Sequence, residues 1–358
     1  MKNGPSYAGS GLVNLVSEIE RRLVGAAPFD GLDGSFSPDG ASTYVLVLFD
    51  GLGIAQLEHR HAEVFRSSLV RSLDAPFPTT TSVSLSTVAT GLPQSRHGQV
   101  AHLSWFPDLQ LVVNTLKWVT ITGEHVAYDY DSVLPRPNLW ERLRSAGVEP
   151  ITVQPGDFQT SPLTRVLYRG ARFEGAWDAD DLVEATVTLA AQGNRLIFTY
   201  VPFVDVAGHV FGLGSEEFSD AMKAAATVWE GIASRLPAGA VLVGTADHGL
   251  IEVSETDKVL VRDPHFDVLR FAGDTRGIHA WGDPGLIADL TAAVGGELVD
   301  PTLWLGPDPS ATALGHLGER LLLAPTGTAV IPKGFDKRLR CYHGGLTPEE
   351  VKIPLLLG

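Results

Sequence analysis

The sequence predicts an α/β fold, a three-layer α/β/α sandwich with a largely parallel central sheet and a small irregular subdomain. Three observations lead to this prediction. Short, β-branched apolar runs alternate along the 358-residue chain with longer segments of helical periodicity, which is typical of a parallel sheet with helices on both faces. Three of the apolar runs end at or just before an aspartate. The composition, with 44% hydrophobic and 19% charged residues, fits a globular protein with a large core.

The elements follow one another in strand–helix order. The predicted helices cover residues 12–23, 83–90, 138–146, 178–191 and 215–236, and the predicted strands cover residues 44–49, 148–153, 195–201 and 240–245. Gly91 and Pro93 end the second helix. Ser215 caps the last helix, and Glu216 and Glu217 follow it, where the helix dipole favours negative charge. A loop rich in Gly, Ser, Pro and Asp is predicted over residues 31–42.

The segment 251–340 is less regular than the rest of the chain. It contains strand-like runs at 259–262 and 321–324 and helical patterns near 285–294 and 309–319. Because no linker separates this segment, we expect one domain over residues 1–358. The segment 251–340 is then an elaboration that returns to the main sheet near His343.

The bulk properties exclude several classes of protein. The net charge of −15 disfavours attraction to nucleic-acid polymers or to anionic membranes. Cys341 is the only cysteine, so no intrachain disulfide is possible. No apolar run approaches the roughly 20 residues of a membrane helix, and residues 1–7 lack the apolar core of a secretion signal. We therefore expect a cytoplasmic protein whose partner is a small molecule.

Carboxylates and imidazoles lie beside the apolar runs. Asp50 ends the first predicted strand, and Asp205 and Asp247 follow two others. The histidines of interest are His209, in Asp-Val-Ala-Gly-His, His248 and the late His343. In a parallel sheet the carboxyl ends of the strands meet at one edge, so these side chains would converge there and offer ligands to divalent metals. Taken alone, each residue could instead have a purely structural role; Asp50, for example, could be a turn residue in Asp50-Gly51.

A hydroxyl cluster, residues 79–82, leads directly into the helix predicted from residue 83. Helix capping is the alternative, because Ser and Thr often cap helices. A phosphate would also be favoured at this helix N-terminus, since free N–H groups and the dipole attract anions. A threonine hydroxyl becomes a nucleophile when a metal lowers its pKa. Together with the predicted ligands, the cluster predicts a two-metal enzyme that acts on phosphate esters.

The same segments carry a family resemblance. Residues 44–51, 77–98, 205–212, 246–249 and 343–354 resemble the alkaline phosphatase superfamily, and most closely its type I phosphodiesterase/nucleotide pyrophosphatase branch. The resemblance implies an alkaline phosphatase-like fold and two divalent metal ions. Zinc is expected, and manganese or iron would also fit. It implies that Asp205, His209 and His343 bind one ion, and that Asp50, Asp247, His248 and the nucleophile oxygen of Thr81 bind the other.

The resemblance also implies the roles of the hydroxyl residues. The pattern Pro-Thr-X-Thr…Thr-Gly fits residues 78–91 and places the nucleophile at Thr81, or at Thr80 if the register shifts. A covalent phospho-threonine would form and then be hydrolysed. Ser82 would contact the phosphate through its backbone, and Ser84 stands where nucleotide-cleaving members carry asparagine, three residues after the nucleophile.

Other functions stay open at this point. A phosphomonoesterase or phosphate-transferring mutase would use the same scaffold, and a non-catalytic phosphate-binding or partner-binding relative is a third alternative. The substrate would be a small phosphate ester, with a nucleotide as one option. Residues 105–118 and 265–281 contain aromatics that would either wall a leaving-group pocket or pack in the core. The sequence determines neither the physiological substrate nor the oligomeric state.

Overall fold

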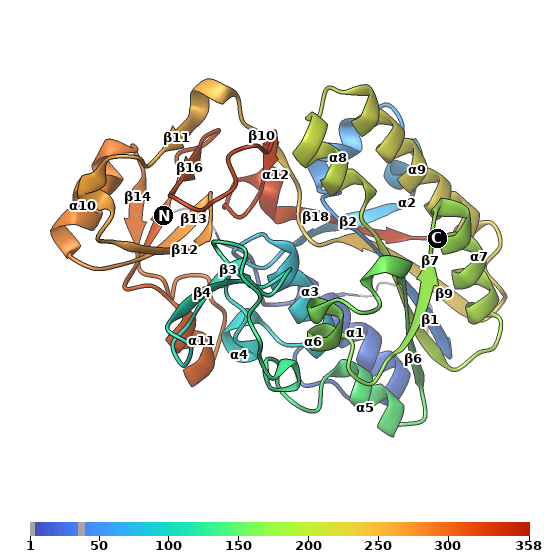
Figure 1. Cartoon of the computed structure of the whole chain (residues 1–358). Coiled ribbons are helices and arrows are strands. Elements are labelled where there is room, and N and C mark those ends of the chain that lie inside the picture. The colour runs from blue at the N-terminus through green and yellow to red at the C-terminus, as the bar shows by residue number, and fades with distance from the viewer. Residues whose placement is uncertain (1–3, 35–39) are drawn as a thin grey trace.

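The computed structural model describes residues 4–34 and 40–358. Residues 1–3, and residues 35–39 of the predicted loop, lie outside this range. Within it, a central sheet with flanking helices occupies one side of the molecule and a second sheet occupies the other (Figure 1).

The central sheet has seven strands within the described residues, in the order β2-β18-β9-β1-β8-β6-β7. Their bounds are β1 Thr43–Phe49, β2 Leu69–Asp74, β6 Glu149–Pro155, β7 Arg172–Ala176, β8 Arg195–Val201, β9 Ala240–Ala246 and β18 Lys352–Leu357. Strand β1 lies between β8 and β9 and pairs with both in parallel, and all seven of its residues are buried. Strand β18 runs antiparallel to both of its neighbours, β2 and β9, and the other pairings of this sheet are parallel. The largely parallel sheet is therefore confirmed.

Helices cover both faces of this sheet, as Figure 1 shows. One face carries α1 (Leu12–Val24), α3 (Thr81–Thr90), α5 (Leu139–Ser145) and α6 (Pro162–Leu167), and the other carries α2 (Glu63–Ser68), α7 (Ala179–Ala190), α8 (Phe203–Phe211) and α9 (Glu216–Ala233). The three-layer α/β/α prediction is confirmed. Helix α3 begins two residues before its predicted start, because Thr80 already adopts the extended backbone of an N-cap.

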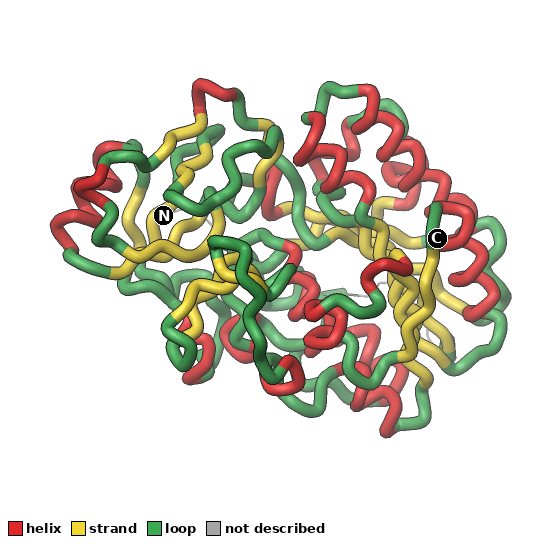
Figure 2. The backbone as a smooth tube through the Cα atoms, in the orientation of Figure 1, coloured by secondary structure: helices red, strands yellow, loops and turns green. Residues whose placement is uncertain are grey.

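The second sheet is antiparallel, with seven strands in the described part of the chain ordered β14-β15-β13-β12-β3-β4-β5. Their bounds are β3 Leu103–Phe106, β4 Leu111–Asn114, β5 Val119–Thr120, β12 Arg270–Asp274, β13 Gly277–Trp281, β14 Glu297–Val299 and β15 Arg320–Leu323. The segment predicted as irregular therefore contributes four strands to an ordered sheet, which strands from residues 103–120 complete (Figure 2). Strands of two to five residues give weak periodicity, and their partners lie far away in sequence.

Shorter elements complete the fold. Two small ladders pair β10 (Ile251–Glu252) with β17 (Cys341–Tyr342) and β11 (Lys258–Leu260) with β16 (Ala329–Ile331). The remaining α-helices are α4 (Gln94–His97), α10 (Pro284–Ala293), α11 (Ala311–His316) and α12 (Pro348–Val351), and 3-10 turns lie at Ile54–Glu58, Tyr130–Ser132, Gly156–Phe158, Glu255–Asp257 and Pro264–Phe266. None of the helices in the described ranges is long and apolar enough to cross a membrane.

Candidate metal centre and active site

The six predicted ligands form two groups at the carboxyl edge of the central sheet. Asp205, His209 and His343 make one group, and Asp50, Asp247 and His248 make the other. Within each group the donor atoms all lie within 4.8 Å of one another. The structure thus brings together residues separated by up to 293 positions in the chain, and their role as ligands remains a prediction.

Parallel pairing places the second group. Phe49 on β1 is in register with Ala246 on β9, so the residues that follow them, Asp50 and Asp247, are neighbours. The Gly51 N–H donates to Asp247 Oδ1 at 3.0 Å. Gly51 has φ +76°, and a Cβ on it would lie 3.0 Å from Asp205 Cα. Only glycine allows these two ligand segments to approach so closely.

Asp205 and His209 lie one helical turn apart on α8, with Asp205 Oδ2 3.3 Å from His209 Nε2. This segment is helical, and the spacing i, i+4 places both side chains on one face of the helix. A Cβ on Gly208 would lie 2.6 Å from Leu250 Cδ1. The lack of a side chain at Gly208 therefore lets α8 pack against the segment that follows His248.

Backbone carbonyls orient two of the histidines. His209 Nδ1 donates to the Cys341 carbonyl at 2.7 Å, and His343 Nδ1 donates to the Thr79 carbonyl at 2.8 Å. A carbonyl only accepts, so each ring carries its proton on Nδ1 and leaves a lone pair on Nε2. The two Nε2 atoms face each other at 3.2 Å. Two lone pairs at this distance are favourable when a cation lies between them.

The carboxylates fit a cation equally well. Asp50 Oδ1, Asp205 Oδ1 and Asp247 Oδ2 are buried and have no hydrogen-bond partner among the described residues. In the part of the chain that the structure describes, the ion pairs of these carboxylates involve histidines only. Burial, followed by the charges of Asp247 and Asp205, raises the pKa of Asp50 well above its usual value. Two divalent ions would neutralise this cluster, so the residues fit the predicted metals.

Thr81 is the first residue of α3, and its Oγ1 lies 3.2 Å from His248 Nε2. As at the start of any helix, its N–H group and that of Ser82 have no intrahelical acceptor. The Thr79 hydroxyl is engaged elsewhere, since it accepts from the Gly344 N–H and donates to the Gly345 carbonyl. Thr80 Oγ1 is buried without a partner in the described structure. Thr81 is thus the threonine of this cluster whose hydroxyl contacts a ligand group.

The side chains of Ser82 and Ser84 are directed at backbone carbonyls. Ser82 Oγ donates to the Ala101 carbonyl at 3.3 Å, and Ser84 Oγ donates to the Asp247 carbonyl at 2.7 Å. Both residues are buried. Ser84 therefore holds the backbone of Asp247, a predicted metal ligand, in place, and direct contact of either serine with a substrate remains a prediction.

Several residues of the site were not predicted from the sequence. The Tyr200 hydroxyl donates to Asp50 Oδ2. Tyr200 is in register with Leu48 on β1, a signal that is readable only once the pairing of β1 with β8 is known. Arg276 and Glu350 form a buried ion pair at 3.0 Å, and Glu350 accepts the Gly345 N–H at 2.8 Å. This pair anchors the segment after His343, and no local sequence pattern marks it.

A pocket of about 1050 Å³ opens beside the metal centre, with Thr81, Asp205, His209 and His343 in its lining. Lys117 and Asp274, from the two stretches expected to supply aromatic walls, also line it. The tryptophans of those stretches pack elsewhere. Trp105 lies between Trp281 and the Arg270 guanidinium, and Trp118 stacks on Tyr128. Trp118 belongs to the main hydrophobic core, and none of the three tryptophans is in the lining of this pocket.

The chain is similar to known proteins in sequence and in fold. The sequence model of the family "Type I phosphodiesterase / nucleotide pyrophosphatase" matches residues 44–294. Murine ectonucleotide pyrophosphatase/phosphodiesterase 5 is 17% identical, with a TM-score of 0.64 over 87% of each chain. Phosphonoacetate hydrolase from Sinorhizobium meliloti 1021, solved with phosphonoformate, is 16% identical, with a TM-score of 0.65 over 89% of this chain and 90% of that one.

The search of curated protein sequences gives no significant match. The family match covers more than two thirds of the chain, from β1 through the end of α10, and includes five of the six predicted metal ligands. The chain therefore belongs to the type I phosphodiesterase/nucleotide pyrophosphatase family and is a metal-dependent hydrolase of phosphoric esters.

Proposed function

We propose that this protein is a phosphodiesterase or nucleotide pyrophosphatase that uses Thr81 as a nucleophile beside two divalent ions, most readily zinc. One observation carries the proposal: Thr81 Oγ1, at the N-terminus of α3, lies 3.2 Å from His248 Nε2 in the second ligand group. A structure of the murine relative, described as an inactive threonine-to-alanine variant in complex with AMP, supports a threonine at this step. The pocket leaves room for a leaving group beyond the phosphate.

Asp205, His209 and His343 would hold one ion, and Asp50, Asp247 and His248 the other. Mixed imidazole and carboxylate ligands favour zinc, and manganese or iron would also bind such a set. When bound, the ions supply positive charge that lowers the pKa of the threonine hydroxyl and neutralises phosphoryl oxygens. The carbonyls of Cys341 and Thr79 keep the Nε2 atoms of His209 and His343 directed at the first site.

The reaction has two halves. In the first, Thr81 Oγ loses its proton to solvent and bonds to phosphorus, while the bond from phosphorus to the leaving oxygen breaks and that oxygen takes a proton from water. In the second, a water oxygen bonds to phosphorus, the bond to Thr81 Oγ breaks, and the hydroxyl regains a proton. The N–H groups of Thr81 and Ser82 at the start of α3 would hold a non-bridging oxygen in both halves.

The test compares bis-(p-nitrophenyl) phosphate with p-nitrophenyl phosphate, using protein whose metal content has been measured. We expect a higher kcat/KM for the diester, and a clear monoester preference would contradict the diesterase assignment. Acid quenching during turnover, followed by peptide mass spectrometry, should find the phosphoryl group on Thr81. A phosphoryl group found on Thr80 instead would assign the nucleophile to Thr80.

A further inference from the structure

The pocket opens on one of the two ligand groups only. Asp205, His209 and His343 line it, whereas the other three predicted ligands do not. Thr81 contacts the other group through His248. In an in-line displacement the attacking and leaving oxygens lie on opposite sides of phosphorus. A leaving group therefore points away from the His248 side, past His209 and His343, and into the pocket.

The wall of the pocket is basic, although the chain carries a net charge of −15. Five cationic side chains line it: Lys117, Arg262, Lys333, Lys337 and Arg338. Outside the ligand groups the only carboxylates in the lining of this described pocket are those of Asp274 and Asp336.

Two of these cations already have partners. Arg338 forms a bidentate pair with Asp336, at 3.0 and 2.7 Å, and Lys333 pairs with Asp267. Lys117, Lys337 and Arg262 form no ion pair with any residue in the described ranges. The pocket therefore presents uncompensated positive charge, which attracts anions.

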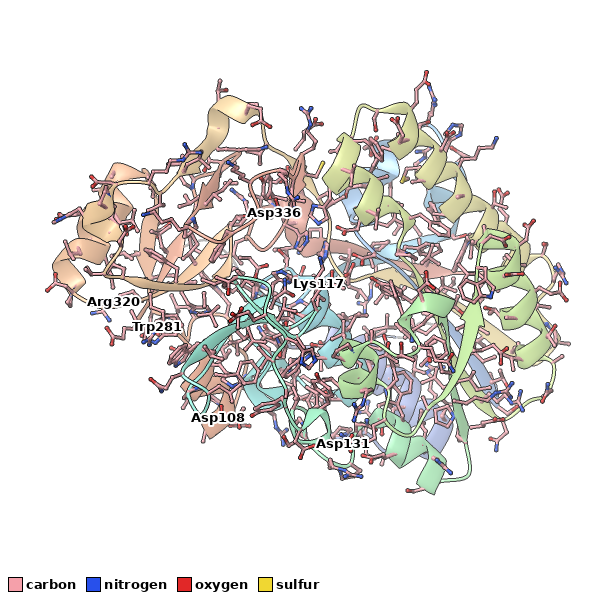
Figure 3. All side chains as sticks on the ribbon, in the orientation of Figure 1. Asp108, Lys117, Asp131, Trp281, Arg320 and Asp336 are labelled. Carbon is pink, nitrogen blue, oxygen red and sulfur yellow. The ribbon has the colours of Figure 1, made fainter. Side chains whose placement is uncertain are left out.

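Lys117 and the loop 332–339 line the same pocket as the first ligand group. Figure 3 shows Lys117 and Asp336 in the middle of the molecule, where this loop faces the β4–β5 turn. The pKa of Asp336 is lowered to about 2, first by Arg338 and also by Lys117. Burial is the main cause that lowers the pKa of His102, a pocket residue, to about 4, and His209 and Lys117 contribute to this shift. The charge of Lys117 therefore influences two other residues of the pocket lining, Asp336 and His102.

We propose that Lys117 and Lys337 bind an anionic group, a phosphate or a carboxylate, that the substrate carries on its leaving group. The inference rests on the proposed function and names its substrate class: phosphoric esters or anhydrides with a charged leaving group. Lys117 comes from the β4–β5 turn of the second sheet, and Lys337 comes from the loop between β16 and β17, so both lysines lie outside the central sheet.

The test uses three substrates that transfer the same thymidine 5′-phosphoryl group and differ only in the leaving group. Their leaving groups are neutral p-nitrophenol, 4-carboxyphenol and pyrophosphate, the last being thymidine 5′-triphosphate with metal ions in excess. In the Lys117→Ala/Lys337→Ala variant we expect kcat/KM for the two charged leaving groups to fall about tenfold or more, through KM. The p-nitrophenyl ester should be hydrolysed as by the unmodified protein.

Lys223→Ala is the matched control, because Lys223 is an exposed lysine on α9 outside the pocket. Losses confined to the triphosphate would assign the subsite to phosphate, and losses confined to the carboxyphenyl ester would assign it to carboxylate. An equal loss with all three substrates, or no loss with any, would overturn the inference. Calorimetric binding of the same compounds to metal-loaded Thr81→Ala protein repeats the comparison without turnover. If the unmodified protein turned over none of the substrates, the proposed function would be rejected. The binding measurements would still show whether the two lysines recognise an anionic leaving group.

Discussion

The imidazole rings of His248 and His343 stack, with 3.8 Å between centroids and 21° between planes. Each ring belongs to a different ligand group, so the two groups share a wall of the site. Burial, and then the neighbouring His248 and His209, lower the pKa of His343 well below its usual value. A neutral imidazole is the form that binds a metal, so the stack keeps this ring ready for coordination.

Removing one ligand from each group tests the division into two sites. We expect Asp247→Ala and His343→Ala each to retain about one metal equivalent fewer than the unmodified protein, because each substitution removes one of only three protein ligands. Metal analysis after gel filtration measures this. Asp220→Ala, an exposed carboxylate on α9, is the control. An unchanged stoichiometry in the two ligand variants would contradict the assignment.

Substitution of Thr81 separates its chemistry from its structural role. Thr81→Ala should lower kcat about a thousandfold or more, because the attacking oxygen is lost. Thr81→Ser keeps that oxygen and should keep measurable turnover. Both variants should match the unmodified protein in Tm and metal content, since the hydrogen bond of this hydroxyl within the described residues is to the ring of His248. A wild-type rate for the alanine variant would show that the nucleophile lies elsewhere.

Tyr200 is expected to increase metal affinity indirectly, through its hydrogen bond to the predicted ligand Asp50. Tyr200→Phe removes the hydroxyl that donates to Asp50 Oδ2, and metal affinity should fall about 10- to 100-fold. Competition with a chromogenic chelator measures this affinity. Tyr168→Phe is the matched control, because that buried hydroxyl has no hydrogen-bond partner in the described structure. Equal effects of the two substitutions would argue against a specific role for the Tyr200 hydroxyl.

The buried ion pair of Arg276 and Glu350 is expected to stabilise the fold around His343, the predicted ligand nearest the C-terminus. Glu350→Ala leaves the guanidinium buried and unpaired, which costs about 3 to 5 kcal/mol in the free energy of unfolding. It also frees the Gly345 N–H, so retention of metal by His343 should weaken. Thermal unfolding and metal analysis report the two effects. Glu63→Ala, which breaks an exposed pair with Arg66, should leave Tm unchanged.

Asp274 predicts a pH dependence of stability. Burial is the main cause that raises its pKa to about 7, so the folded protein holds this proton more tightly than the unfolded chain. Its contribution to stability is therefore complete below about pH 4 and is lost as the pH rises through about 7. Asp274→Asn keeps an acceptor for the His102 N–H and removes the titration. Urea unfolding of metal-free protein should show that the free energy of unfolding declines less for the variant between these pH values. The same decline in both proteins would contradict the role of Asp274.

The sequence by itself determined the parallel sheet and the chemistry of its edge. Runs such as residues 44–49 and 196–198 are apolar throughout, because strands buried on both faces need no polar side chain. Asp50 and Asp247 follow such strands directly, and the carboxyl ends of parallel strands meet at one edge. For these reasons six residues scattered along the chain could be assigned to one site.

Only the tertiary structure decided the second sheet, the helical form of the Asp205 segment and the residues that support the ligands. Contacts such as Tyr200 with Asp50, or Arg276 with Glu350, join elements whose register and distance no local pattern encodes. The tertiary structure also decided the basic wall of the pocket, since Lys117 and Lys337 lie 220 positions apart in the sequence. Periodicity reports which face of an element is buried, whereas packing between elements decides which side chains meet there.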